Sequence, residues 1–258
     1  MPHKLFQTKA FVSYWLNAVD EHSLHSPFFF DFYTNVVKNK TGETAVAGIE
    51  NLRKKLLSDT RPLETQDPGS CKSNKPRTIS SIASTSVSPL KFSSLYLRMI
   101  RHFKARTILE LGTSLGINTL YLAQPKDAHV TTFEGSAEIA DIARLTFEFA
   151  ESKNIQLVEG NLDHTLSTHL QTARKIDFAF VDANHRYQPT LSYLEQLLAR
   201  IHGSSIIVLD DIHYSAEMEK AWHEVKNHKL VYGSADLFRC GVLFFDPSLN
   251  KQHVILQL

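Results

Sequence analysis

The stretch from Thr107 to Ala123, TILELGTSLGINTLYLA, has the residue types and spacing of a binding site for a polar ligand. An apolar run of strand length contains Glu110, and a glycine-bounded turn and a segment with helical spacing follow it. Glycines let the backbone approach a ligand, and the free N–H groups at a helix start face that ligand. The sequence therefore predicts binding at the turn residues Gly112, Thr113, Ser114 and Gly116.

The spacing of the glycines indicates which ligand. A dinucleotide fold uses G-x-G-x-x-G, whereas this turn has G-x-x-x-G with Glu110 two residues before its first glycine. That acid would repel a pyrophosphate but suits a cationic amino-acid group. The pattern E-x-G-x-x-x-G resembles motif I of the class I S-adenosylmethionine-dependent methyltransferases. The resemblance implies that Glu110 helps to hold the methionine end of the cofactor.

A second acid, Glu134, ends the next predicted strand, eighteen residues after Gly116. A carboxylate at this position can accept hydrogen bonds from both ribose hydroxyls, so we expect Glu134 to bind the cofactor. The alternative is an acid that caps the helix after Gly135 and Ser136.

The turn after the third strand reads Glu159-Gly160-Asn161-Leu162-Asp163. In the methyltransferase family this turn borders the adenine, which implies that Asn161 bonds its edge and Leu162 packs on its face. An Asx turn that opens the next helix is an equal alternative. Asp163 stays open as a substitute for Asn161.

Three further acids follow the fourth and fifth strands: Asp182, and the pair Asp210 and Asp211. Ligands bind at the carboxyl ends of parallel strands, where these carboxylates can converge. They would repel one another unless a cation were present, and oxygen ligands suit Mg²⁺ or another divalent metal. The alternative is that the acids cap helices.

The segments IDFAFVDANHRYQPTLSYLEQLL and GSSIIVLDDIHY look like the metal-dependent small-molecule O-methyltransferases of the catechol, caffeoyl-coenzyme A and macrocin types. The resemblance covers about residues 90–245. It implies a metal held by Asp182, Asp210 and Asp211, with Asp182 also beside the cofactor and in the catalytic machinery.

One position departs from that family. The catechol-type enzymes have Lys three residues after the fourth-strand Asp, where this chain has His185. Histidine is a competent general base, so we expect His185 to remove the acceptor proton, with His213 as a second candidate. That either residue only lines the pocket stays open.

The elements that must position these residues alternate along the chain. Apolar strand runs and helical segments follow one another from Thr107 to His228, and strands predominate after it. This alternation predicts an α/β fold with a doubly wound, mostly parallel, seven-stranded sheet, and leaves an eighth strand open at 254–256. We expect a methyltransferase domain over residues 90–258.

Residues 1–89 form a separate helical extension in this prediction. Helices are expected at about 5–19, at 27–37 with Ser26 as the cap, and at 47–57, and they could cover the main domain, close over the substrate or form a homodimer. Residues 58–88 are rich in Ser, Thr and Pro, so we expect a long loop there that acts as a lid.

Composition limits the function classes. Lys plus Arg is 28 against 27 for Asp plus Glu, which argues against a broad nucleic-acid surface. The two cysteines, Cys71 and Cys240, predict unpaired thiols, and the absence of a signal-like or spanning apolar run predicts a cytoplasmic protein that binds no membrane. We expect O-methylation of a small-molecule hydroxyl. An RNA (tRNA) methyltransferase and a cofactor-binding protein without turnover remain as alternatives.

Overall fold

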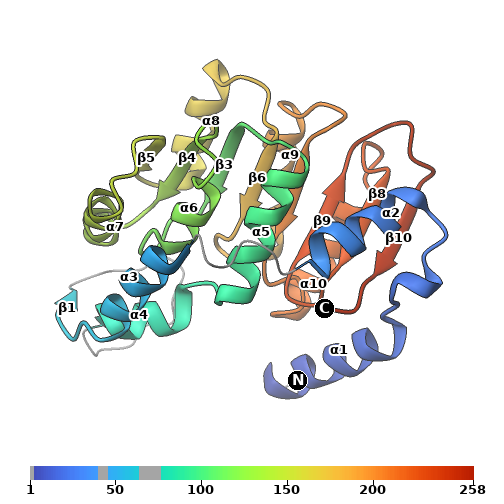
Figure 1. Cartoon of the computed structure of the whole chain (residues 1–258), viewed down its shortest axis with the longest axis horizontal. Helices are drawn as coiled ribbons and strands as arrows, with labels where there is room; N and C mark the ends of the chain where they lie inside the picture. The colour runs from blue at the N-terminus through green and yellow to red at the C-terminus, as the bar shows by residue number, and fades with distance from the viewer. Residues whose placement is uncertain (1–2, 40–45, 64–76) are drawn as a thin grey trace. The chain divides into compact units, whose positions relative to one another are not determined.

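The computed structural model describes residues 3–39, 46–63 and 77–258, and the chain packs as two compact units (Figure 1). One unit comprises Met1–Asn39 with Thr172–Leu258, and the other comprises Lys40–Gln171. These units follow packing rather than function, so the predicted functional boundary after residue 89 stays a prediction.

The unit Lys40–Gln171 contains three parallel strands in the order β3-β4-β5, which are β3 (Thr107–Leu111), β4 (His129–Glu134) and β5 (Ile155–Glu159). Their register pairs Leu111 with Phe133 and Glu134 with Glu159. The carboxyl ends of the three strands therefore lie along one edge, and the loops that follow them share that edge.

The helices of this unit are α3 (Ala47–Leu57), α4 (Ile79–Ser86), α5 (Leu90–His102), α6 (Ile117–Leu122), α7 (Ala137–Phe149) and α8 (Leu162–Thr172), and a short hairpin joins β1 (Pro62–Leu63) to β2 (Arg77–Thr78). Helix α6 packs on α3, α5 and α7, and α7 packs on β4 and β5. A buried apolar cluster at these contacts, including Leu97, Leu120 and Phe147, holds α6 at the end of β3.

The prediction of one long loop over residues 58–88 was wrong for its last part. Residues Ile79–Ser86 form helix α4, which buries Ile79 and Ile82 against Leu115. Thr78 and Ser81 form a reciprocal capping box at its start, a signal that the Ser/Thr-rich composition concealed. The middle of the predicted lid, residues 64–76, lies outside the described residues and includes Cys71.

The other unit contains β6 (Phe178–Val181), β7 (Ile206–Leu209), β8 (Gly233–Asp236), β9 (Gly241–Phe244) and β10 (Gln252–Ile255), in the order β10-β8-β9-β7-β6. Strand β9 is antiparallel to β7 and β8, whereas the β6–β7 and β10–β8 pairs are parallel. Helices α9 (Tyr187–Leu198) and α10 (Ala216–Lys226) pack on each other.

The N-terminal helices belong to this unit. They are α1 (His3–Asn17), the short turn η1 (Glu21–Ser23), α2 (Pro27–Phe32) and the π-helical η2 (Tyr33–Val37). Ser26 caps α2 as expected, and the rings of Phe28, Phe29 and Phe32 pack edge-on against Phe244 of β9. The aromatic residues of α2 are therefore buried against the strand hairpin near the C-terminus.

The predicted fold class is confirmed: the described strands form a mostly parallel α/β set with flanking helices. There are eight strands in it instead of seven, because residues Gln252–Ile255 add β10 next to β8. A turn over residues 227–230 follows α10, and β8 begins at Gly233.

Candidate active site

The glycine turn lies between β3 and α6. The backbone N–H groups of Gly112 and Thr113 both donate to the carbonyl of Phe133, and Gly116 N–H donates to the carbonyl of Thr113. Gly112, Ser114 and Gly116 have φ angles of 102°, 49° and 81°, in the left-handed region. The turn is therefore a fixed backbone cradle at the start of a helix, as the sequence predicts.

Gly116 is required by packing within the protein. A Cβ atom at Gly116 would lie 2.5 Å from Cε1 of Phe147 on α7. The second glycine of the pattern thus lets α6 approach α7, a role that the motif alone does not reveal.

Glu110 is completely buried below the turn. Its carboxylate accepts hydrogen bonds from Asn118 Nδ2 at 2.9 Å, Thr119 Oγ1 at 2.5 Å and Thr132 Oγ1 at 2.6 Å. Burial raises the pKa of Glu110 to about 7, although these three donors act to lower it. Glu110 therefore ties β3 to β4 and α6, and supports the turn from beneath.

Thr113, predicted to bind the cofactor, directs its hydroxyl inward. Its Oγ1 lies 2.6 Å from Oγ1 of Thr132, and the residue is only 3% exposed. The hydroxyl of Thr113 thus takes part in the same buried polar network as Glu110.

Glu134, predicted to bind the ribose of the cofactor, is hydrogen-bonded to the glycine turn. One carboxylate oxygen accepts from Ser114 N–H at 2.9 Å, and the other accepts from Ser136 N–H at 3.0 Å. The acid at the end of β4 and the turn after β3 therefore form one site. The hydrogen bond from Ser136 N–H also fits the alternative, in which Glu134 is an acid of the local turn before α7. The ribose role and the turn role of Glu134 are therefore both compatible with these bonds.

The turn after β5 has the Asx geometry that the sequence left open. Asn161 Oδ1 accepts from the backbone N–H of Asp163 at 2.9 Å at the start of α8. Asn161 and Asp163 are exposed and Leu162 is half-buried. The adenine contacts of Asn161 and Leu162 stay predictions.

Two polar atoms on the glycine turn bear on whether S-adenosylmethionine fits there. Ser114 Oγ and Asn118 Oδ1 are buried and have no hydrogen-bond partner among the described residues. Buried polar atoms are nearly always paired in folded proteins. A ligand with an amino and a carboxylate group would supply such partners, so these residues fit the methionine end of the cofactor.

A second cluster lies at the ends of β6 and β7. Asp182, His185 and Asp211 each offer one ligand atom, and these atoms lie within 4.8 Å of one another. His185 Nε2 is 3.3 Å from Asp182 Oδ1, and the His185 ring lies 5.7 Å from that of Tyr214. Two carboxylates and an imidazole form a donor set that suits a divalent cation.

Asp210 is not a member of this cluster. It is completely buried, and Arg239 Nη2 lies 2.9 Å from its Oδ2, with Nε at 3.2 and 3.3 Å from its two oxygens. Asp210 is paired with Arg239, whereas Asp211 offers its carboxylate to the cluster with Asp182. The cluster therefore consists of Asp182, Asp211 and His185, and His185 stands where Asp210 was predicted as the third ligand.

The backbone around the cluster is unusual. Asn184, His185 and Asp211 have φ angles of 65°, 43° and 52°. Left-handed conformations in non-glycine residues cost energy and concentrate at functional sites. The Asn184 side chain, which donates to the Tyr193 hydroxyl at 2.5 Å, helps to hold this loop.

His213 occupies a different environment from His185. Its Nε2 lies 2.9 Å from Asp236 Oδ2 and its Nδ1 lies 3.3 Å from Glu219 Oε1. Burial lowers the pKa of His213, but the two carboxylates outweigh burial and raise it above the ordinary value. A ring held between two acids is suited to anchoring the loop after β7.

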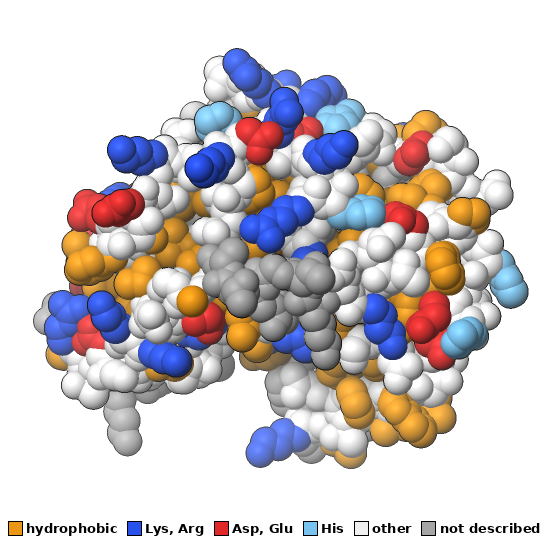
Figure 2. All heavy atoms as spheres, viewed as in Figure 1, with side chains coloured by type: hydrophobic (Ala, Val, Ile, Leu, Met, Phe, Trp, Pro, Cys, Tyr) orange, Lys and Arg blue, Asp and Glu red, His pale blue; other side chains and the backbone are white. Residues whose placement is uncertain are grey.

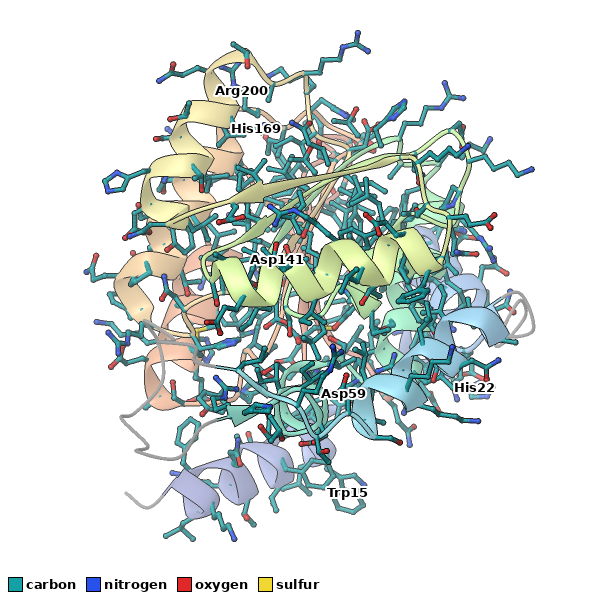
Figure 3. All side chains as sticks on the ribbon, turned by 90° about the vertical axis from the view of Figure 1, so that its left-hand side faces the viewer. Trp15, His22, Asp59, Asp141, His169 and Arg200 are labelled. Carbon is teal, nitrogen blue, oxygen red and sulfur yellow. The ribbon has the colours of Figure 1, made fainter. Side chains whose placement is uncertain are left out.

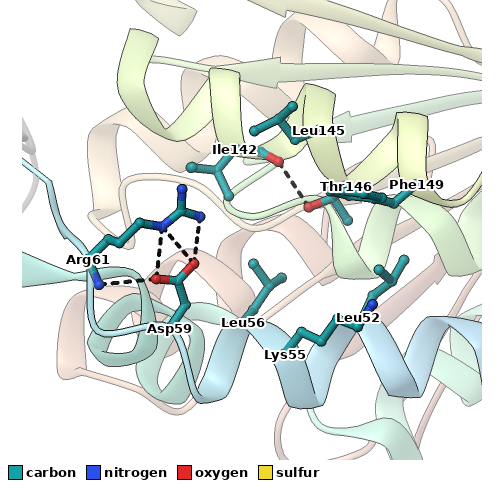
Figure 4. A pocket seen from close by; sticks show the side chains of 9 residues that line it. All are labelled: Leu52, Lys55, Leu56, Asp59, Arg61, Ile142, Leu145, Thr146 and Phe149. Atoms are coloured by element: carbon teal, nitrogen blue, oxygen red, sulfur yellow. Dashed lines mark hydrogen bonds and ion pairs between the residues drawn. The ribbon is translucent and has the colours of Figure 1, made fainter.

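The structure also contains a small apolar hollow of about 210 Å³ between α3 and α7 (Figure 4). Two of its polar lining residues, Asp59 and Arg61, are paired with each other, with Arg61 Nη2 at 2.6 Å from Asp59 Oδ2. Among its described lining residues there is none of the predicted site residues, so it is not the cofactor site.

Sequence analysis missed Arg239 and the partners of Glu110. Arg239 follows β8 in the turn before β9, and a lone arginine in such a turn carries no motif. Thr132 and Thr119 lie in a strand and a helix, where their hydroxyls give no periodic signal. Glu110 and Asp210 lie in or directly after apolar strand runs, where a buried carboxylate needs hydrogen-bond or charge partners. This was the one signal in the sequence that such partners exist.

Comparison with protein families identifies the central part of the chain. A family model described as a methyltransferase domain matches residues 109–212. This range contains the glycine turn, Glu134, the turn at Asn161 and the cluster acids Asp182 and Asp211. No curated protein is similar to this chain in sequence.

Solved structures are similar in fold. An O-methyltransferase of Bacillus cereus in complex with SAH is 18% identical with a TM-score of 0.58, covering 83% of this chain and 94% of its own. An SAH-bound methyltransferase of Podospora anserina is 16% identical with a TM-score of 0.55, covering 80% and 97%. The O-methyltransferase TomG of Streptomyces achromogenes, in complex with SAM, is 20% identical with a TM-score of 0.52, covering 61% and 80%.

The fold, the glycine turn with its two acids and the matching family model agree with one another. The fold is that of solved methyltransferase structures, and residues 109–212 match a methyltransferase domain.

Proposed function

We propose that the protein transfers the methyl group of S-adenosylmethionine to a hydroxyl of a small molecule, with the assistance of a divalent cation. The observation that carries the proposal is the cluster of Asp182, His185 and Asp211, whose ligand atoms lie within 4.8 Å of one another. Two of the proteins with a similar fold are O-methyltransferases, which supports the same reaction class.

The residues of the glycine turn bind the cofactor in this proposal. Ser114 and Asn118 contact its amino-acid end, and Glu134 accepts hydrogen bonds from the ribose while its backbone partners keep it in place. Glu110 acts from below as a support, because its oxygens are already engaged by three side chains.

Asp182 and Asp211 hold the cation in this proposal. When bound there, a divalent cation would supply Lewis-acid chemistry, which would make an acceptor hydroxyl easier to deprotonate. Asp182 fixes the ring of His185 through Nε2, which leaves Nδ1 to accept the proton of the acceptor. Positioning and charge complementarity then supply most of the rate for direct in-line transfer.

Calorimetry tests the two parts separately. Titration of the purified protein with S-adenosylmethionine should show binding, and no binding at millimolar cofactor would overturn the enzyme assignment. Titration with Mn²⁺ should show a site that Asp182→Ala and Asp211→Ala abolish. Asp141→Ala is the matched control, because Asp141 is an exposed acid on α7.

Activity assays then separate the remaining alternatives. Asp182→Ala that keeps full activity without added metal would remove the metal role and leave the methyltransferase intact. Retention of the protein on RNA that falls steeply with salt would favour the RNA alternative. Cofactor binding with no methyl transfer to any dihydroxy-aromatic or sugar probe would favour a binding protein without turnover.

A further inference from the structure

Helix α1 has an exposed apolar face. Trp15 and Leu16 are 65% and 68% exposed, and Leu5, Phe11 and Val12 are each about half exposed. Figure 2 shows hydrophobic side chains gathered on the surface over α1, and Figure 3 shows the Trp15 side chain projecting outward from the helix. Large contiguous apolar patches of this kind mark interaction surfaces.

The opposite face of α1 is fixed to its own unit. Tyr14 is buried, its hydroxyl donates to the carbonyl of Leu256 at 2.6 Å, and its ring lies 5.3 Å from that of Phe238. A bridge between Val19 and Leu256 secures the chain directly after the helix. Helix α1 is therefore held as a docked element and presents its apolar face in a defined orientation.

The exposed residues follow the pattern of a helix-pairing seam. Leu5, Thr8, Val12 and Trp15 recur at intervals of three and four, which are the a and d positions of two heptads, and Leu16 lies beside them. In an antiparallel pair, a positions pack against d positions of the partner. Leu5 of one helix would then meet Trp15 of the other, and Thr8 would meet Val12.

The size of the stripe fits the core of a two-fold interface. Covering its apolar side chains would remove on the order of 500 Å² from water, against roughly 800 Å² per partner in a standard interface. The stems of Lys4 and Lys9, which are exposed beside the stripe, would supply much of the remainder. An isologous contact uses the same patch on both copies, and this seam is complementary to itself when antiparallel.

We propose that the protein forms a two-fold symmetric homodimer through antiparallel packing of α1 against α1 of a second copy. A lipid surface is the competing occupant, but it favours a broad apolar face with many basic residues, whereas α1 has a narrow seam and two lysines. The proposal does not depend on the metal or on the acceptor.

Sedimentation velocity from 0.5 to 100 µM tests the dimer. The wild type should sediment as a dimer at tens of micromolar, and Val12→Glu and Leu16→Glu should weaken association by at least about 100-fold, because each buries a carboxylate in the seam. Phe149→Glu is the matched control: it replaces a 73% exposed apolar residue on α7 and should leave the dimer intact. Both substituted positions are exposed on the surface of the single chain, so the variants should fold, and circular dichroism checks this.

Two further measurements address orientation and the competing occupant. With Cys71 replaced by Ser, a mixture of Thr8→Cys and Val12→Cys chains should form a mixed disulfide, whereas Thr8→Cys alone should not. The other tryptophan, Trp222, is 1% exposed and should not change its environment when the dimer dissociates. A red shift of tryptophan fluorescence on dilution would therefore report that Trp15 leaves the interface. A wild type that is monomeric at 100 µM, or a dimer that persists in both glutamate variants, would overturn the proposal. A blue shift of Trp15 fluorescence that occurs only with anionic vesicles would overturn it in favour of a lipid surface.

Discussion

The guanidinium of Arg239 forms a close ion pair with the completely buried carboxylate of Asp210, with Nη2 at 2.9 Å from Oδ2. Arg239 Nη2 also lies 3.9 Å from Asp211 Oδ1, so one side chain lies beside both acids of the Asp-Asp pair. Because Asp210 is neutralised by Arg239, the two neighbouring acids have different tasks: Asp210 fixes the end of β7, and Asp211 is directed to the cluster with Asp182 and His185.

Replacing Arg239 by Ala should destabilise the protein by about 3 kcal/mol, because it leaves a buried carboxylate without its partner. Urea unfolding measures the change. Arg106→Ala is the control, since Arg106 and Asp127 form an ion pair at 3.1 Å that is mostly exposed and should contribute below about 1 kcal/mol. Equal losses in the two variants would contradict a special role for Arg239.

Gly116→Ala should destabilise the protein by roughly 2 kcal/mol, because the new Cβ meets Phe147 and the φ angle disfavours a side chain. Gly135→Ala is its control, as a Cβ there meets nothing within 4 Å. Thermal unfolding should separate the two variants. Adding Phe147→Leu to Gly116→Ala should recover part of the loss, and no recovery would place the cause in the backbone alone.

Glu110→Gln should make the protein more stable at pH 8 and change its stability little at pH 4. The folded pKa of about 7 lies above the ordinary value of 4.5, so the folded protein keeps a proton between these values that the unfolded chain releases. The free energy of unfolding of the wild type therefore falls by about 3 kcal/mol as the pH rises from about 4.5 to about 7, and it stays reduced above pH 7.

Urea unfolding between pH 4 and pH 8 measures the effect of Glu110→Gln. The hydroxyls of Thr119 and Thr132 can rotate to accept from the new amide, so the network is preserved. Glu148→Gln, at an exposed position on α7, should keep the pH dependence of the wild type. An unchanged pH slope in Glu110→Gln would show that the buried acid is not its source.

Glu134→Ala should weaken cofactor binding by at least about 10-fold, which corresponds to 1.4 kcal/mol, because it removes the proposed ribose acceptor and frees the N–H of Ser114. Glu159→Ala is the matched control. It lies opposite Glu134 in the register of β4 and β5, and it pairs with Arg144 at 2.7 Å on the surface. Calorimetric titration with S-adenosylmethionine compares the two, and equal affinities would exclude the ribose role.

Sequence alone predicts most of the fold because the buried strands are short apolar runs separated by helical segments. The runs around Ile108, Val130, Phe180 and Val208 each become a strand, and the helix at 47–57 has the predicted bounds. The prediction fails where composition and structure disagree. The segment after Thr78 is rich in Ser and Thr, yet tertiary burial of Ile79 and Ile82 makes it a helix.

The candidate site is only partly predictable. The backbone bonds between Glu134 and the glycine turn follow from strand order, because the ends of β3 and β4 must be neighbours. The choice between Asp210 and Asp211 depends on Arg239, twenty-eight residues from Asp211 in a turn that no local pattern identifies. The inward rotation of Thr113 likewise depends on Thr132 across the sheet. The described helices include none that is long and apolar enough to cross a membrane.

The bridge between Val19 and Leu256 has a consequence for biosynthesis. Residues 1–39 leave the ribosome well before the strands that cover their aromatic side chains. The continuous segment Lys40–Gln171 can complete its own packing earlier, while α1 and α2 wait with their apolar faces exposed. Nascent chains stalled before Val254 should therefore be the ones that chaperones retain.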